Sequence, residues 1–260
     1  MNSGLQEFLD RKVEEYNRPS FILRDPVSIP HRFRNTADIE IAGFFAAIFS
    51  WGNRITIIQK TMALMQLMDH APHEFILKHR EKDLKKLMGF KHRTFKDIDL
   101  FYFIRFLRFH YQQHQSLEDA FLLHDQQKML PGSIWAESAL NAFHQYFFSL
   151  QDAPPRTFKH IASPGKNSTC KRLNMYLRWM VRKDRKGVDF GIWKRISPAN
   201  LVCPIDLHVA RVAKKFGLLS RQQTDWPAAL ELTGHLRNLD KDDPVKYDFA
   251  LFGLGVIEHF

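Results

Sequence analysis

Two residues of opposite charge, Lys171 and Asp206, each stand at the start of a predicted helix. Lys171 follows the segment SPGKNSTC, and Asp206 lies within CPIDLHVARVAKKFG. A lysine amine that has lost its proton is a nucleophile and can form a covalent bond to an electrophilic carbon. The surrounding elements decide whether this lysine can act in that way.

The helix that carries the lysine is expected to open near Ser168. Its apolar residues recur at helical spacing and predict one buried face, formed by Leu173, Tyr176, Leu177, Met180 and Val181. Lys171 then lies in the first turn, where the positive end of the helix dipole, with Arg172 and Arg178 nearby, favours the neutral amine. The alternative is an ordinary solvated lysine.

The second helix is expected to begin at Asp206, because aspartate caps helix starts well. Gly217 supplies the stop at its other end. Between them the apolar face is formed by Val209, Val212, Ala213 and Phe216. Capping alone would explain the aspartate. It would not explain a lysine at one helix start combined with a Pro-x-Asp-x-His entry to a later helix.

These two segments resemble the helix-hairpin-helix DNA glycosylases, in which a hairpin carrying a lysine is followed by a Pro-Val-Asp-type helix start. The match is closest in CPIDLHVARVAKKFGL. It extends forward through DWPAALELTGHLRNLDKDDPVKYDFALFGLGV and more weakly back to DIEIAGFFAAIFSWGNRITIIQK. The resemblance implies that Lys171 attacks the sugar of a damaged nucleotide and that Asp206 assists, in a base-excision repair glycosylase with AP lyase activity.

Two features of the hairpin depart from the common pattern of that superfamily. The usual Gly-x-Gly turn before the lysine is replaced by GKNSTCK, which puts the phosphate-binding loop in question. The separation of 35 positions between Lys171 and Asp206 is longer than in common members and is similar to that of the archaeal 8-oxoguanine glycosylase branch. The chain is also similar to a bacterial family known only as a domain of unknown function.

The resemblance implies a partner, double-stranded DNA with a damaged base, which must be extruded to be reached. It also implies that a polar side chain in the turn SWGNR fills the gap left by that base, a position that Asn53 matches. The alternative is an ordinary helix–helix turn, because Asn and Gly are common in turns. The expected DNA contacts, made by side chains and helix-start amides, are Asn53, Arg54, Lys166, Asn167, Ser168, Arg172 and His208.

Three residues are candidates for the base pocket. Trp51 either stacks on a base or fills the core. Asp248 and Phe252 are four residues apart on the terminal helix, so a carboxylate could accept from a purine N–H while a ring stacks on it. The branch that the chain resembles implies 8-oxoguanine, whose N7 carries a proton that guanine lacks. The alternative is a core Phe252 and an exposed Asp248.

Composition fits a folded protein with a polyanionic partner. The 260 residues are 45% hydrophobic and include 23 Phe, which excludes a disordered chain, and the net charge is +10. Nucleic acid fits this charge, because each neutralised phosphate releases counterions, although ribosomes and acidic lipids fit it too. We expect a monomer.

Cys170 and Cys203 are the only cysteines in the sequence. Two thiols cannot form a four-cysteine iron–sulfur or zinc site, so no cluster, metal or other cofactor is expected, and both are read as buried reduced thiols. The N-terminus has no apolar signal core, and no apolar run is long enough to cross a bilayer. The expected compartment is the cytoplasm, with no membrane partner.

Helical periods and helix punctuation in nearly every segment predict an all-α fold. Helices are expected over 5–16, from Thr36 or Asp38, after Asn53, and after a cap at Ser133. By resemblance, residues 1–260 form one compact unit of two interlocked lobes, about 1–35 with 186–260 and about 36–185, with the hairpin at the cleft between them. Two other classes stay open: a nucleic-acid-binding helical module without catalysis, and a helical protein-interaction domain.

Overall fold

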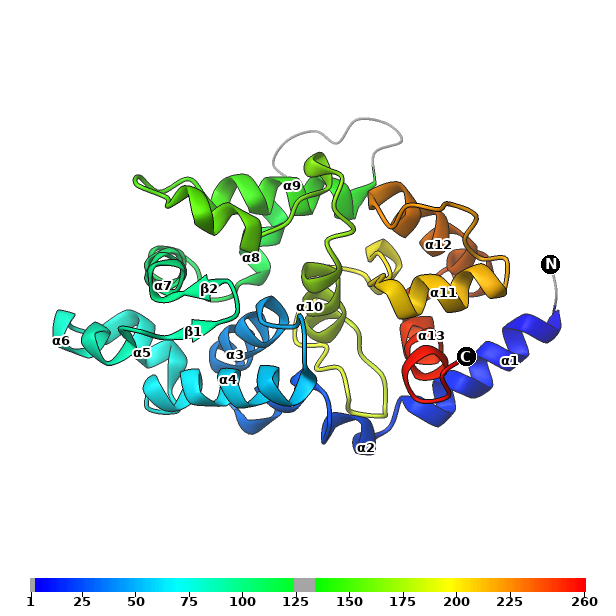
Figure 1. Ribbon diagram of the computed structural model, residues 1–260, viewed down its shortest axis with the longest axis horizontal. Coiled ribbons are helices and arrows are strands. Elements are labelled where there is room, and N and C mark those ends of the chain that lie inside the picture. Colours follow the sequence, from blue (N-terminus) through cyan, green and yellow to red (C-terminus); the bar gives the residue numbers. More distant parts are fainter. Residues whose placement is uncertain (1–2, 124–133) are drawn as a thin grey trace. The chain divides into compact units, whose positions relative to one another are not determined.

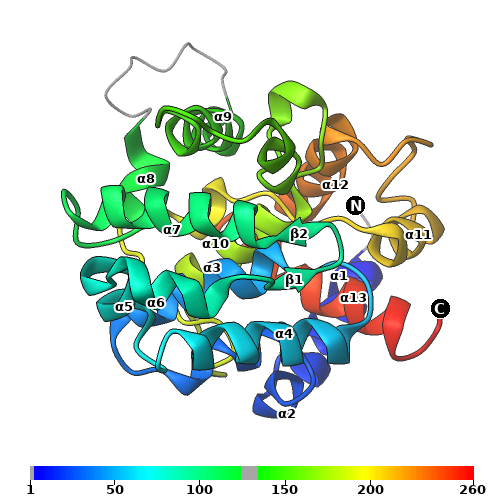
Figure 2. The same cartoon turned by 60° about the vertical axis from the view of Figure 1, so that its left-hand side comes forward.

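The computed structural model describes residues 3–123 and 134–260 and is predominantly helical, which confirms the all-α prediction (Figure 1). Its short strands β1 (Lys91–His92) and β2 (Phe95–Lys96) form an antiparallel hairpin that leads into a long helix (Figure 2). Ser133, the expected cap of α9, lies outside the described residues. The α-helices are α1 (Ser3–Tyr16), α2 (Pro19–Ile22), α3 (Thr36–Ile48), α4 (Arg54–Leu67), α5 (Pro72–Lys78), α6 (Glu81–Leu84), α7 (Asp97–Tyr111), α8 (Glu118–Leu122), α9 (Trp135–Phe147), α10 (Lys171–Val181), α11 (Leu207–Lys215), α12 (Trp226–Leu239) and α13 (Tyr247–Val256).

Contacts between residues divide the chain into two units. Within the described residues, unit 1 takes in the segments up to 23, 134–137 and 163–260, and unit 2 takes in 24–123 and 138–162. The boundaries differ from those expected from the sequence, because α10 joins unit 1. The reason is electrostatic as well as apolar, since Arg178 and Arg182 near the end of α10 pair with Asp248 and Asp243 at the C-terminal end of the chain.

In unit 1, α13 is packed closely by two other helices, and its glycines make this possible. A Cβ at Gly253 would overlap the ring of Tyr16 on α1. A Cβ at Gly255 would lie 3.1 Å from the Cβ of His208 on α11. The segment FGLGV therefore gives α1 and α11 the room to approach α13, and this places the start of α11 firmly in the unit.

Unit 2 is built around α3, a strongly apolar helix with most of its residues buried. It begins at Thr36, one of the two predicted starts, and Asn35 caps it. Its core is aromatic: the Phe44 ring stacks on Phe103 of α7 with centroids 5.7 Å apart, and Phe103 meets Phe147 at 4.7 Å. Close packing of this kind holds α3, the middle of α7 and the end of α9 together.

None of the helices among the described residues is long and apolar enough to cross a membrane.

Candidate active site

The segment before α10 contains two left-handed residues that make the helix begin later than predicted. Asn167 and Cys170 both take left-handed backbone conformations, with φ of 57° and 50°. A residue in that conformation cannot continue an α-helix, so α10 begins at Lys171 and the predicted start near Ser168 is wrong. The Oγ of Ser168 accepts a hydrogen bond from the Cys170 amide at 3.2 Å, which holds the turn.

Asp206 caps α11, as predicted. Its Oδ1 accepts hydrogen bonds from the backbone amides of His208 at 2.9 Å and Val209 at 3.0 Å. Gly217 follows the helix with φ of 67°, a left-handed conformation that ends helices readily. The start and the stop predicted for this helix are both confirmed.

The structure brings Lys171 and Asp206 together. The Nζ of Lys171 lies 3.0 Å from Oδ2 of Asp206. The side chains are 31% and 20% exposed, so a reactant in solution can reach both. The two carboxylate oxygens therefore have separate partners: one caps α11, and the other meets the amine on the first residue of α10.

The electrostatics of Asp206 favour its charged form. Burial by itself would raise the pKa of this carboxyl group, but the Lys171 ammonium and the Val209 amide oppose it and hold the pKa below its usual value. Asp206 is therefore a carboxylate at neutral pH.

Behind this pair lies a buried ion network that the sequence did not predict. Arg178 on α10 donates to Asp248 on α13, and its Nε lies 3.3 Å from Oδ1 of Asp189. Burial raises the pKa of Asp248 to about 6, an effect to which the nearby Asp206 charge adds and which Arg178 opposes. The sequence suggested that Arg178 adds positive potential around Lys171. In the structure, the carboxylates of Asp248 and Asp189 compensate the charge of Arg178.

Arg182 extends the same network from the end of α10. Its Nε donates to Asp243 at 2.8 Å and its Nη1 to Asp184 at 2.7 Å. Asp189, fully buried, accepts from it at 3.2 Å. No local pattern distinguishes such buried charges from solvated ones; the one available signal was the gathering of arginines and aspartates in 178–189 and 243–248.

Neither of the two base-pocket candidates on α13 is exposed. Asp248 is only 6% exposed, so the alternative of an exposed helix residue is wrong. Its bond to Arg178 means that a base would have to compete with a buried guanidinium for this acceptor. Phe252 is half-buried, and its ring lies edge-on to Phe21 with centroids 6.0 Å apart.

The remaining candidates in unit 1 surround the Lys171–Asp206 pair in sequence. Lys166 and His208 are exposed. Asn167 is exposed too, and its side chain is hydrogen-bonded to Asp225. Ser168 and Arg172 are half-buried, and burial lowers the pKa of Arg172 to about 10. Lys166, Asn167 and His208 are thus the exposed residues among the predicted phosphate contacts in this unit.

In unit 2, the turn SWGNR is tied to the β1–β2 hairpin. Asn53 is exposed and caps α4, accepting from the Thr56 amide at 3.1 Å, and Arg54 is the first residue of that helix. The Trp51 ring is half-buried and lies 4.8 Å from His92, which favours the core reading of this residue. Asn53 therefore has the structural role that turn statistics predict, while its exposure leaves it accessible to a partner.

Neither cysteine forms a disulfide. Cys170 and Cys203 are free and buried, and burial raises the pKa of both thiols. Among residues 3–123 and 134–260, no group of three or more His, Cys, Asp or Glu side chains is arranged to hold a metal ion.

The fold and the pair define a predominantly helical protein with a lysine–aspartate contact between two helix starts. The chain belongs to the family described as Protein of unknown function (DUF2400), whose sequence profile matches residues 25–257. No curated protein and no solved structure matches the chain.

Proposed function

We propose that the protein is a DNA glycosylase with AP lyase activity, acting through Lys171 and Asp206. The observation that carries the proposal is their contact, with Nζ and Oδ2 only 3.0 Å apart and both side chains partly exposed. A solvated lysine or a simple cap would not require this contact. It is the arrangement that the resemblance to helix-hairpin-helix glycosylases implies, and it joins residues 35 positions apart in the sequence.

The chemistry follows from the two groups. Asp206 accepts a proton from the Lys171 ammonium, and the freed amine attacks C1′ of the damaged nucleotide. The bond from C1′ to the base breaks, and the base leaves with the electron pair. The proton that Asp206 took up passes to O4′ as the sugar ring opens, which gives a Schiff base to Lys171 and restores the carboxylate. The carboxylate then stabilises the positive charge of the Schiff base and accepts a proton from C2′, and the 3′ phosphate leaves with the electrons of its bond to C3′.

The phosphate contacts are proposed for the loop before α10 and the start of α11. Asn167, with φ of 57°, takes the left-handed conformation that a glycine ordinarily supplies, so the loop turns sharply without the usual Gly-x-Gly. Lys166 and His208 are exposed on either side of the pair. A net charge of +10 supports a polyanionic partner.

The proposed substrate is duplex DNA that carries an oxidised purine, with 8-oxoguanine as the first candidate. This choice depends on the resemblance alone. Asp248 is not proposed as the acceptor for the base, because Arg178 already holds its carboxylate. We assign it instead to the support of α10, where it fixes the helix that carries the lysine.

The test is borohydride trapping of the full chain on duplexes that carry 8-oxoguanine, uracil, alkylated adenine or an abasic site. The wild type should give a covalent adduct, Lys171→Gln should give none, and the control Lys241→Gln should match the wild type. Lys241 is exposed, and its substitution removes the same charge from unit 1. DNA binding with no adduct on any duplex would contradict the enzyme and favour the binding module.

A further inference from the structure

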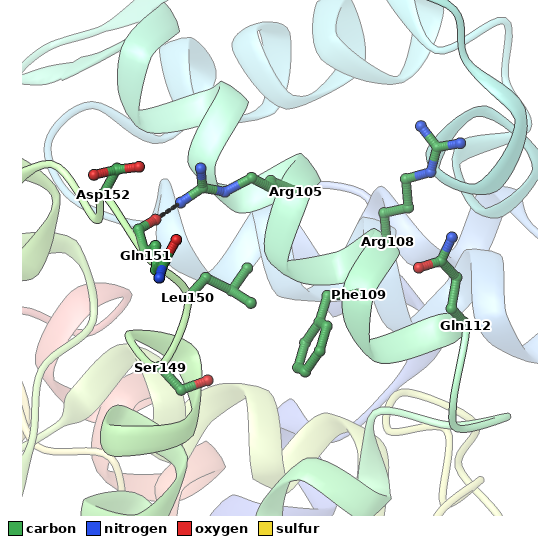
Figure 3. A pocket seen from close by; sticks show the side chains of 8 residues that line it. All are labelled: Arg105, Arg108, Phe109, Gln112, Ser149, Leu150, Gln151 and Asp152. Carbon is green, nitrogen blue, oxygen red and sulfur yellow. Dashed lines mark hydrogen bonds between the residues drawn. The ribbon is translucent and has the colours of Figure 1, made fainter.

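Unit 2 contains a pocket far from Lys171 in the sequence, between the C-terminal half of α7 and the segment after α9 (Figure 3). Its volume is about 640 Å³, within the range of small-molecule sites. Arg105, Arg108 and Phe109 line it from α7 and Gln112 from the residue that follows this helix, and Leu150 and Asp152 line it from the other side. All of these residues belong to unit 2.

Two guanidinium groups reach this pocket without a carboxylate partner. Within the described part of the chain, neither Arg105 nor Arg108 has an acidic side chain at ion-pair distance. Arg105 donates to the carbonyl oxygen of Gln151 and lies 5.1 Å from the Tyr102 ring centre. Arg108 has a long contact, 3.5 Å, from Nη1 to Nε2 of His79. Each guanidinium has five N–H donors, so most of them are available to a ligand.

Folding alone does not explain two arginines here. Residues three apart on a helix are neighbours, and like charges at that spacing destabilise it. The C-terminal end of the α7 dipole favours Arg108, which is in the last turn, but Arg105 is a turn earlier. A phosphate bound at the guanidinium of Arg108 would reduce this repulsion, and this supports an anionic ligand at that end of the pocket.

The polar groups gather at two ends, with an apolar middle. Figure 3 shows Arg108 and Gln112 at one end, Arg105 and Asp152 at the other, and Phe109 between them. Phe109 is half-buried, and its ring is supported by Tyr146 with centroids 6.0 Å apart. A supported aromatic face suits a flat ring, and nucleobases stack on such faces whatever their sequence.

We propose that this pocket binds a nucleotide. The phosphate is held by the guanidinium of Arg108 and the amide of Gln112, and the base stacks on Phe109. Asp152, at the other end, accepts from an amino group of the base. The nucleotide is either a free mononucleotide or one unit of a single strand, and the two sources share this chemistry. The site does not involve Lys171 or Asp206, so it stands or falls independently of the proposed function.

Isothermal titration calorimetry on the full chain tests the site with adenosine monophosphate, adenosine, inorganic phosphate and a short single-stranded oligonucleotide. Adenosine monophosphate or the oligonucleotide should bind with a Kd below about 1 mM. This Kd should also be lower than that of adenosine alone or of phosphate alone. A preference for the oligonucleotide identifies the strand as the source, and a preference for the mononucleotide identifies the free form.

Arg108→Gln should weaken this binding about tenfold or more, because it removes a charge-assisted bond to phosphate. The control is Lys85→Gln, which removes one charge from an exposed position of unit 2 outside the pocket and should leave the affinity unchanged. Absence of binding by both nucleotide probes overturns the site. The site is also overturned if inorganic phosphate binds as tightly as the nucleotide probes. Equal losses of nucleotide affinity in Arg108→Gln and Lys85→Gln would overturn it as well.

Discussion

The carboxylate of Asp206 divides its two oxygens between α11 and Lys171: Oδ1 caps the helix, and Oδ2 lies 3.0 Å from the lysine Nζ. A cap fixes the position of its side chain, so the aspartate is already oriented toward the amine when a substrate arrives. This double role predicts that stability and catalysis can be separated by the choice of substitution at Asp206.

Asp206→Asn should change stability little, since asparagine caps as well as aspartate, whereas Asp206→Ala should lose about 1 kcal/mol of unfolding free energy. Both variants should slow base release by orders of magnitude, because neither side chain can accept the lysine proton. Chemical denaturation and single-turnover excision assays measure the two effects. Equal stability of the Asn and Ala variants would contradict the capping role.

The close approach of α1 to α13 predicts that Gly253→Ala is destabilising. The added methyl group would overlap the Tyr16 ring, and overpacking of this kind costs about 1–3 kcal/mol. The matched control is Gly234→Ala on α12, where a Cβ would meet nothing within 4 Å. That change should stabilise the protein by about 0.5–1 kcal/mol, because alanine favours a helix over glycine. Thermal unfolding that moves in the same direction for both variants would refute this packing.

Asp248 predicts a pH dependence of stability with a definite sign. Its pKa is raised from 3.8 to about 6, so the folded protein holds this proton more tightly than the unfolded chain does. Its contribution to the free energy of unfolding is therefore fully present below about pH 4 and is lost as the pH rises through about pH 6.

The comparison is with Asp248→Asn, which cannot titrate at this position. The difference in unfolding free energy, wild type minus variant, should fall by at most about 1.4 kcal/mol per pH unit in that window and then level off. Denaturant titrations at a series of pH values measure it. A difference that is constant or rises between about pH 4 and pH 6 would show that Asp248 is already charged at the lower limit.

Binding to undamaged duplex DNA should weaken steeply as salt is added, with a slope that reports the number of phosphates contacted. Lys166→Gln should reduce the magnitude of this slope by about 1, and Lys241→Gln should not. Fluorescence anisotropy at several salt concentrations gives the slopes. A response independent of salt would argue against a nucleic-acid partner altogether.

The features predicted correctly from the sequence are those that short segments determine. The cap at Asp206, the stop at Gly217 and the apolar character of α3 depend on residues a few positions apart, so composition and spacing reveal them. The start of α10 was predicted wrongly because Cys170 is left-handed. That conformation is uncommon for residues other than glycine, and no pattern in the segment signals it.

Features that depend on tertiary packing were not accessible in the same way. The spacing of apolar residues indicates two helices but not that Lys171 of one meets Asp206 of the other; only the resemblance implied that they act together. The buried pair of Arg178 and Asp248 was not predicted, because a buried charge and a solvated charge have the same sequence signature. The two residues are 70 positions apart in the sequence.

The most direct test of the central claim is to identify the residue that becomes covalently attached to DNA. The wild-type protein is trapped with borohydride on a duplex with an abasic site, digested, and examined by peptide mass spectrometry. The account predicts a single modified site at Lys171, in the peptide that spans the start of α10. Attachment at another lysine, or no attachment while the DNA is still cleaved, would contradict it.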